Sequence, residues 1–591
     1  MSGIVLARPR SRATAFSLDA DAVAIGLVAA VTLVLTIVTW RAWGDLGQDT
    51  GYDFVAATRV AHGHLPYSDF VYYYGPLAPF ALGFAALIGG SGFMTFAAVG
   101  LVLTYAIVAA TYALARTQTG PTGAAIVAAA TSAIAFSPTN VSFVVPHTYS
   151  ESFAILLTLG FLLGLARASA GSRGAALAGI CAGLVALTRP EFEAAVLAAA
   201  AVWLVVRARG GRPVRGLLVR IALPAALVPA VVYGAYLTAL SPHRLFFENL
   251  YPVDTLRAGG SAILRSQAPL TARSIGQVLA YLALYAVGAV ALVLGARGLE
   301  RLSSRTRAFA IAAVAAAVLA VAAVDPEAAR SKLQWVIGGF PAASAIAACA
   351  IVIFVLRRRH ALAPREEAFA AVVVVAAVLA AKTYDGFFFL ADHAQPAVYV
   401  APFVLVALAR LHLVDLARTR SAYAAGAAWL AVIAVVCVGL TIKDGRAQSA
   451  NIAGPGGSMR VTPAEATVYR AAIGAIDSST RPGEPILIAP QLTALYTLTG
   501  RTDPLPQISL VPGALPTAAD ERAAIDALEH ANVRLALTDR HSFSDYGQTR
   551  FGASFDRVLA SWIRRHFNHA ALLRPGGGVD HTLDVWVRRG S

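Results

Sequence analysis

Long apolar runs recur along most of this chain, and they limit its possible folds more than any other feature. A transmembrane helix needs about 20 mostly apolar residues to cross the roughly 30 Å hydrocarbon core of a bilayer. The runs lie near residues 23–40, 95–115, 122–137, 150–166, 175–189, 192–207, 220–240, 275–296, 308–324, 335–356, 367–382, 396–411 and 421–441. Only 14% of the 591 residues are charged, against about 25% in soluble domains. We therefore predict a polytopic α-helical membrane protein with about 13 transmembrane helices.

Arginine clusters indicate how these helices are oriented. Cytoplasmic loops of membrane proteins carry an excess of Lys and Arg. The clusters follow every second run and comprise Arg116, Arg167, Arg173, Arg207, Arg209, Arg212, Arg215, Arg297, Arg301, Arg305, Arg307, Arg357, Arg358, Arg359, Arg365, Arg410, Arg418 and Arg420. We place these ends and the N-terminus in the cytoplasm, so the net charge of +15 does not indicate a nucleic-acid partner. The short apolar segment Pro76–Gly90 would reverse this orientation if it crossed the membrane, so we predict an interfacial or re-entrant helix on the outer side.

The chain is predicted to have two parts. Residues 1–441 form the transmembrane module, with a first outer loop at about 41–94, and residues 442–591 lie outside the cytoplasm after an odd number of spans. In the second part, helices are expected at Pro463–Ile476, Ala518–Ala531 and Phe555–Phe567, and strands at Pro485–Ala489, Val533–Thr538 and Leu583–Val587. Their alternation is typical of a small α/β domain. The Arg-rich, Ala-rich composition is typical of a GC-rich bacterial genome, so we expect the bacterial cytoplasmic membrane.

The first outer loop carries the densest group of polar side chains. Asp49 follows the first apolar run, which ends near residue 40, and Asp53 lies one turn further, in a short helix expected from Thr50 to Ala61. A carboxylate there can act as a general base on a hydroxyl that arrives from the aqueous side. Alternatively, Asp49 is only the N-cap of that helix. Asp69, Tyr72 and Tyr74 are candidate substrate contacts, although the tyrosines also fit an interfacial aromatic belt.

Further ionisable residues lie at the predicted outer ends of later spans. Each costs about 2.5–3.5 kcal/mol at membrane depth, so we treat them as candidates for substrate binding. They are His147, Glu151, Arg189, Glu191, Lys332, Lys382 and His393. Structural alternatives remain open: a His147–Glu151 pair on one helical face, and an internal Arg189–Glu pair at the helix break of Pro190. The two lysines are point-charge partners for phosphate, or stand there by chance.

These residues carry a resemblance to a known family. The loop QDTGYDFVAATRVAHGHLPYSDFVYYYGPL resembles the first outer loop of GT-C superfamily membrane glycosyltransferases of the family-39-like branch, which includes protein O-mannosyltransferases and aminoarabinose transferases. The family's features read here as Asp49-Thr50, Leu65 to Phe70 and Gly75-Pro76-Leu77. The stretch ADHAQPAVYVAP, with His393, is similar to the beginning of a late span in the family. ALYTLTGRTDP resembles a segment of the outer domain in many bacterial members.

The resemblance implies a GT-C-like fold and an inverting transfer of a sugar from a polyprenyl-phosphate donor. Asp49 would deprotonate the hydroxyl of a glycan, lipid or protein acceptor, and the lipid phosphate would leave. The family's acidic partner of Asp49 is Thr50 here, so a second carboxylate would come from Asp53 or elsewhere. A lysine found in many relatives is replaced by Tyr74-Gly75. The candidate cations for the donor phosphate are Arg189, Lys332 and Lys382.

Other functions stay open at this stage. The alternatives are a polytopic transporter or flippase for a lipid-linked saccharide and an O-antigen-type ligase. No repeated half, as expected of many transporters, is visible in the sequence. The residues imply no cofactor and specify no metal site, although the loop carboxylates could hold a divalent cation.

Overall fold

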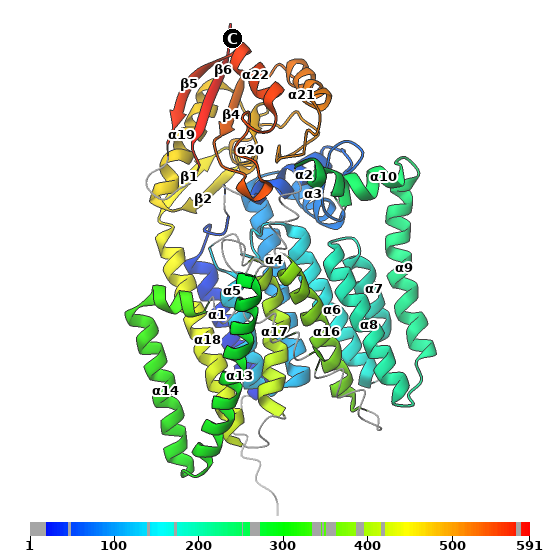
Figure 1. The fold of residues 1–591 in the computed structure, drawn as a ribbon, viewed down its shortest axis with the longest axis vertical. Coiled ribbons are helices and arrows are strands. Elements are labelled where there is room, and N and C mark those ends of the chain that lie inside the picture. The colour runs from blue at the N-terminus through cyan, green and yellow to red at the C-terminus, as the bar shows by residue number, and fades with distance from the viewer. Residues whose placement is uncertain are drawn as a thin grey trace, which may run out of the picture.

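The computed structural model describes residues 19–44, 46, 49–138, 142–170, 174–250, 252–259, 272–333, 344, 348–349, 362–385, 395–414, 420–574 and 581–590. Long helices form a bundle, and an α/β region lies over one end of it (Figure 1). The loop that follows the first helix lies between these two parts, where α2 and α3 are drawn.

The bundle is built from the apolar runs of the sequence. Twelve of the thirteen predicted runs coincide with a helix, and the run at 335–356 lies mostly outside the described residues. The helices are α1 (Ala20–Val38), α4 (Phe93–Gln118), α5 (Pro121–Ala135), α6 (Tyr149–Ala170), α7 (Ala175–Val185), α8 (Pro190–Arg209), α9 (Arg215–Leu237), α13 (Ala272–Glu300), α14 (Ser304–Val324), α16 (Pro364–Asp385), α17 (Gln395–Val414) and α18 (Arg420–Ala447). Within the described chain, six helices are long and apolar enough to cross a membrane: α1, α4, α6, α9, α14 and Ala424–Ala447 of α18. The mainly helical class is confirmed, and the count of 13 spans stays a prediction.

Several predicted cytoplasmic arginines meet at one end of the bundle. They join the ends of helices that are distant in sequence. The contacts are Arg116 with Asp21, Arg365 with the carbonyl oxygen of Thr117, and Arg207 and Arg212 with Glu367. Because these contacts link the C-terminal ends of α4 and α8 to the N-terminal ends of α1 and α16, the basic clusters that contain these four arginines share one end of the bundle.

The opposite end carries short helices. They are η1 (Asp49–Gly51), α2 (Tyr52–Ala61), α3 (Leu77–Gly89), α10 (Pro242–Leu245), the π-helix η3 (Phe246–Leu250) and α11 (Val253–Gly259). The segment predicted to be interfacial is α3, which packs against α2 and α4. The packing of α2 and α3 is close, because a Cβ on Gly83 would lie 2.7 Å from the Val60 side chain. Whether α3 lies in a membrane interface stays a prediction.

The α/β region contains two sheets. Strands β1 (Ala450–Gly454) and β2 (Gly457–Val461) form an antiparallel hairpin. The second sheet has the order β3 (Leu487–Ala489), β4 (Leu535–Asp539), β6 (Leu583–Arg588) and β5 (Phe567–Leu573), in which only the β3–β4 pair is parallel. The helices are α19 (Pro463–Ser479), α20 (Ala494–Thr499), α21 (Ala518–His530), η5 (Ser544–Tyr546) and α22 (Arg557–His566). All three predicted helices and all three predicted strands are present, and β1, β2 and β5 were not predicted.

One apolar core continues from the bundle into this region. The same cluster of buried side chains contains Phe96 of α4, Met459 of β2 and Leu495 of α20. A second cluster, with Leu528 of α21 and Trp562 of α22, lies between these helices and the sheet. The α/β region is therefore packed onto the bundle across the boundary predicted near residue 441, and the helix α2 of the first outer loop lies in this packing.

Candidate active site

The first outer loop begins directly under α20. Asp49 opens η1, and the N-cap of α2 is Gly51 rather than Asp49. A Cβ on Gly51 would lie 1.9 Å from the backbone nitrogen of Ala494, so only glycine fits at this contact. The side chain of Asp49 lies outside the described part of the structure. The backbone thus puts Asp49 where the loop, the bundle and the α/β region meet.

Asp53 is enclosed one turn later. Its Oδ1 accepts a hydrogen bond from the Tyr72 hydroxyl at 2.6 Å, and its Oδ2 accepts one from the backbone N–H of Tyr149 at 2.5 Å. The residue is 1% exposed. Burial raises the pKa of Asp53, and these hydrogen bonds, with a charge on His147, act in the opposite direction. In this geometry Asp53 joins α2 to the start of α6, and its carboxylate does not face an incoming substrate.

The loop tyrosines form a packed cluster. Tyr52 stacks on Tyr72 and Tyr73, with ring centroids 5.6 and 6.1 Å apart, and the Tyr74 ring meets Tyr72 edge-on. Tyr72 has no exposed surface. The hydroxyl of Tyr67 donates to the carbonyl oxygen of Tyr74 at 2.6 Å. The aromatic-belt interpretation therefore does not hold for Tyr72, which is a core residue that supports Asp53.

Three other predicted residues, from three segments of the chain, surround Arg189. Its Nε lies 2.7 Å from Glu191, its Nη1 lies 3.3 Å from Glu151, and its guanidinium lies 4.9 Å from the centroid of the Tyr74 ring. Arg189 is the N-cap residue of α8, and Pro190 occupies the first helical turn. The structural alternative of an internal Arg–Glu pair at this helix break is thus present. A phosphate at Arg189 would have to compete with two carboxylates.

A small cavity lies beside this cluster. Its volume is about 180 Å³, and it is lined by Gly75, Ala186, Thr188, Pro190, Glu193, Pro229, Tyr233, Phe246 and Leu250. The Gly75 N–H donates to the Thr188 carbonyl oxygen at 2.7 Å. A Cβ on Gly75 would lie 2.2 Å from the Leu187 backbone. Gly75 is therefore held against the α7–α8 junction, in the lining of a cavity with both polar and apolar walls.

The remaining predicted residues are not part of this cluster. Asp69 accepts the backbone N–H of Leu65 at 2.7 Å and is about half exposed, so it closes a surface turn. His147 is half-buried and close enough to influence Asp53. Lys332 is exposed, near an ion pair between Arg330 and Asp444. The side chain of Lys382 and the whole of His393 lie outside the described residues. Across the described chain, no group of three or more His, Cys, Asp or Glu residues is arranged to hold a metal ion.

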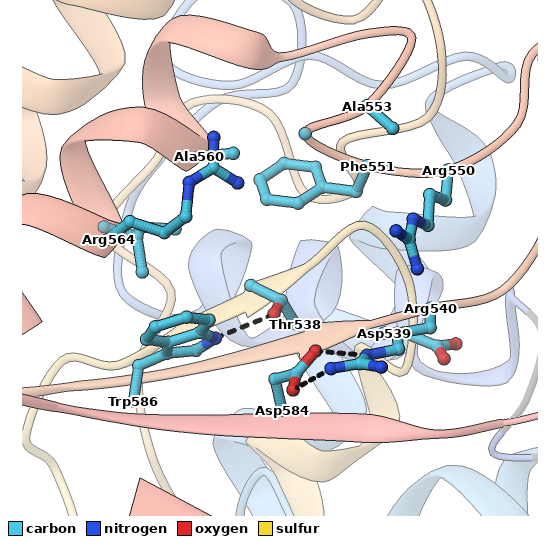
Figure 2. A pocket seen from close by; sticks show the side chains of 12 residues that line it. Thr538, Asp539, Arg540, Arg550, Phe551, Ala553, Ala560, Arg564, Asp584 and Trp586 are labelled. Carbon is cyan, nitrogen blue, oxygen red and sulfur yellow. Dashed lines mark hydrogen bonds and ion pairs between the residues drawn. The ribbon is translucent and has the colours of Figure 1, made fainter. Parts of the chain in front are cut away.

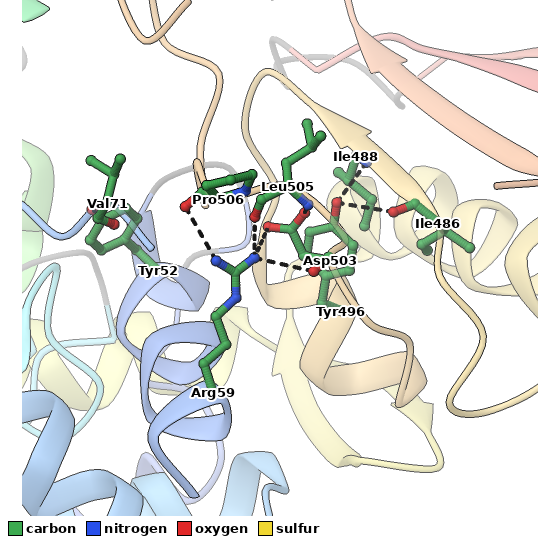
Figure 3. Close-up of polar contacts among 9 residues, drawn as sticks. All are labelled: Tyr52, Arg59, Val71, Ile486, Ile488, Tyr496, Asp503, Leu505 and Pro506. Carbon is green, nitrogen blue, oxygen red and sulfur yellow. Dashed lines mark hydrogen bonds and ion pairs between the residues drawn. The ribbon is translucent and has the colours of Figure 1, made fainter. Parts of the chain in front are cut away.

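One pair of residues at this junction was not predicted. Arg59 of α2 forms an ion pair with Asp503 at 3.1 Å and also donates to the carbonyl oxygens of Leu505 and Pro506, at 2.5 and 3.2 Å (Figure 3). The Val71 N–H donates to the same Pro506 oxygen. Arg59 is the one arginine between residues 42 and 115, in a loop predicted to lie outside the cytoplasm, where positive charge is disfavoured. That isolation is the signal from which its special role could have been found.

Comparisons with known proteins give only distant neighbours. No protein-family profile and no curated protein sequence matches the chain. Among solved structures, archaeal oligosaccharyltransferase AglB from Archaeoglobus fulgidus, in complex with an inhibitory peptide and a dolichol-phosphate, is 16% identical; the match covers 92% of this chain and 72% of that one, with a TM-score of 0.44. ArnT from Cupriavidus metallidurans in the apo state is 15% identical, with 96% and 98% covered and a TM-score of 0.44. The same ArnT bound to undecaprenyl phosphate has a TM-score of 0.42.

Both neighbours are GT-C superfamily membrane glycosyltransferases. They are what this chain is similar to. At these scores the likeness carries no conclusion about its activity, which has to rest on its own residues.

Proposed function

We propose that this chain is an integral-membrane inverting glycosyltransferase that moves a sugar from a polyprenyl-phosphate donor to a glycan, lipid or protein acceptor on the outer face. One observation carries the proposal. The loop that begins with Asp49 is held between the bundle and the α/β region, by Asp53 below and by Arg59 above. Its sequence is also the stretch that resembles the family's catalytic loop.

The reaction needs one base and one place for the donor. Asp49 takes the proton of the acceptor hydroxyl, the hydroxyl oxygen bonds to the anomeric carbon, and the bond from that carbon to the phosphate oxygen breaks with the electron pair leaving on the lipid phosphate. A positioned general base contributes about 10²–10⁴-fold to such a rate. The cluster of Arg189, Glu151, Glu191 and Tyr74 beside the 180 Å³ cavity supports a donor site there. Lys332 and Lys382 stay candidate cations for the donor phosphate.

Consumption of a lipid-linked donor tests the proposal. The purified full-length protein in lipid nanodiscs is incubated with a panel of radiolabelled polyprenyl-phosphate sugars and an envelope fraction of the producing organism. We expect one donor to lose its sugar to the acceptor fraction, with release of polyprenyl phosphate. If no donor is consumed while labelled lipid-linked sugar crosses a sealed vesicle membrane, the chain is a transporter and the proposal fails.

A further inference from the structure

A second cavity lies in the α/β region, away from the first outer loop. Its volume is about 260 Å³, and it opens between α22, the turn at residues 550–553 and the sheet formed by β4 and β6. Figure 2 shows Phe551, Arg550 and Arg564 along one side, and Trp586, Thr538 and Asp584 with Arg540 along the other. Nothing in the proposed transfer step uses these residues.

The charges around this cavity favour an anionic ligand. Arg540 donates two hydrogen bonds of 2.7 Å to the carboxylate of Asp584. The Nε2 atom of His569 lies 2.8 Å from Oδ1 of the same carboxylate. The second acid in the lining, Asp539, is paired with His581 at 2.6 Å. The acids of the lining are therefore already engaged.

Two other arginines line the cavity, and within the described part of the chain neither forms an ion pair with an acidic residue. Among the described residues, the guanidinium of Arg550 has no hydrogen bond or ion pair, and that of Arg564 reaches only the Ser561 hydroxyl, at 3.1 Å. Both side chains are exposed to solvent at the cavity. A guanidinium binds carboxylate or phosphate groups through paired N–H donors. Figure 2 shows Arg550 and Arg564 at opposite ends of this side of the cavity, with Phe551 between them. Each guanidinium therefore provides a separate place for such a group.

The rest of the lining suits a ring with an apolar face and hydroxyl groups. Trp586 lies on the sheet side, with its indole N–H donated to Thr538 at 3.0 Å, and Phe551 lies on the opposite side. Aromatic rings offer large rigid faces to such a ligand, and the paired Asp584 and Arg540 offer polar atoms between them. Drug-sized ligands occupy pockets of roughly 300–1,000 Å³, so a cavity of about 260 Å³ fits one sugar ring rather than a larger group.

We propose that this cavity binds a saccharide that carries a carboxylate or phosphate group, as one unit of an anionic glycan. The anionic group binds to the guanidinium at one end of the cavity, Arg550 or Arg564, and Trp586 and Phe551 enclose the ring. In Figure 1, α22, which lines one side of the cavity, lies on the part of the α/β region that faces away from the bundle. A ligand that also reaches Asp49 therefore has to be an extended chain of sugars. Binding itself does not depend on the proposed function, whereas the role of this glycan as acceptor does.

Equilibrium binding to the full-length protein in nanodiscs tests the inference. The probes are glucuronic acid, glucose 6-phosphate, glucose and inorganic phosphate, measured by isothermal titration calorimetry. The test variants are R550Q/R564Q and Phe551→Leu. The matched control is Arg557→Gln, an exposed arginine of the same helix α22 that does not line the cavity.

We expect at least one charged sugar to bind, and to bind at least tenfold more tightly than glucose or inorganic phosphate. Tight binding of glucuronic acid points to a uronate unit, and tight binding of glucose 6-phosphate points to a phosphorylated unit. R550Q/R564Q should weaken this binding at least tenfold, Phe551→Leu should weaken it for the sugars alone, and Arg557→Gln should leave it unchanged.

Three results would overturn the inference: no charged sugar binds, R550Q/R564Q binds it like wild type, or inorganic phosphate binds as tightly as the sugars. Donor consumption is measured in the same preparation. A protein that consumes a polyprenyl-phosphate sugar but binds no charged sugar here keeps the proposed function and loses this inference. A protein that binds the charged sugar but consumes no donor keeps this inference and loses the proposed function.

Discussion

Arg59 of α2 and Asp503 of the α/β region form an ion pair between residues 444 positions apart in sequence, with 3.1 Å between Nη2 and Oδ2 (Figure 3). The side chains are 14% and 2% exposed. Burial raises the pKa of Asp503 to about 6, against the opposing effect of the Arg59 charge. The position of the first outer loop thus depends on a charge pair withdrawn from solvent.

Removing the cation should destabilise the protein strongly. Arg59→Met leaves the Asp503 carboxylate buried without its partner, which typically costs about 3–5 kcal/mol. We expect a clear drop in the thermal unfolding midpoint in nanodiscs, and recovery of most of it in the double variant Arg59→Met/Asp503→Leu. Arg481→Met, at an exposed site, is the control. An Arg59→Met midpoint equal to that of the control would show that the pair does not hold the loop.

The hydroxyl of Tyr72 should matter through Asp53. Tyr72→Phe removes one of the two hydrogen bonds described above, and an unsatisfied buried acceptor costs about 1–3 kcal/mol. We expect lower thermal stability and slower donor consumption, because the start of α2 is less firmly held. Tyr105→Phe, whose hydroxyl bonds Thr36 at an exposed site, should change both quantities little. Equal effects of the two substitutions would show that the hydrogen bond from Tyr72 to Asp53 does not hold the start of α2.

The contact between η1 and α20 should tolerate no side chain at Gly51. The Cβ of Gly51→Ala would lie 1.9 Å from Ala494, so backbone must move. We expect faster proteolysis at the junction and loss of donor consumption. Gly474→Ala is the matched control, because its Cβ meets nothing within 4 Å and alanine favours the helix α19 by about 1 kcal/mol. A Gly51→Ala protein as resistant as Gly474→Ala would contradict the close docking.

Stability should fall as pH rises because of Asp556. Burial, with a smaller effect from nearby Glu521, raises the pKa of Asp556 to about 8. An acid whose pKa is raised on folding favours the folded state when protonated, so its stabilisation is lost as pH increases through the folded value. Asp503, with a pKa of about 6, acts in the same direction at lower pH.

Between about pH 6 and pH 8, Asp556 is therefore the one of these two acids that still changes its charge in the folded protein. Over this range it should lower the free energy of unfolding by up to about 1.4 kcal/mol per pH unit. Asp556→Asn should flatten the dependence of the unfolding midpoint on pH across this range. Asparagine also suits the left-handed backbone at this position, where φ is 49°. If the unfolding midpoint of Asp556→Asn changes with pH as steeply as that of wild type, groups other than Asp556 cause the pH dependence.

The sequence allowed the helical bundle to be predicted because its signal is local. Each apolar run specifies a helix by itself, and the arginine clusters at Arg116 and Arg207 show which ends share a side. Strand β5 escaped prediction because it is an edge strand in which only Phe567 is buried, so its pattern lacks the usual alternation. The hairpin β1–β2 escaped because the turn glycines Gly454 and Gly457 resemble a linker.

The sequence pointed to several residues that meet near the first outer loop, but not to the contacts that they make. The spacing of Asp49 and Asp53 put them one turn apart, yet it gave no sign that Asp53 is enclosed by Tyr72 and by the N–H of Tyr149, which lies 96 residues away. The pair of Arg189 with Glu191 is local and was among the alternatives, whereas Glu151 of α6 reaches Arg189 only through tertiary packing. Long-range contacts of this kind are invisible to residue periodicity.

The most direct test of the central claim is the rate of donor consumption by Asp49→Asn. The substitution keeps the shape of the side chain and removes its basicity, so we predict a loss of at least about 100-fold with an unchanged unfolding midpoint. Asp69→Asn, which alters an exposed turn carboxylate of the same loop, should stay close to wild type. If Asp49→Asn transfers sugar as fast as wild type, Asp49 is not the base and this account of the site is wrong.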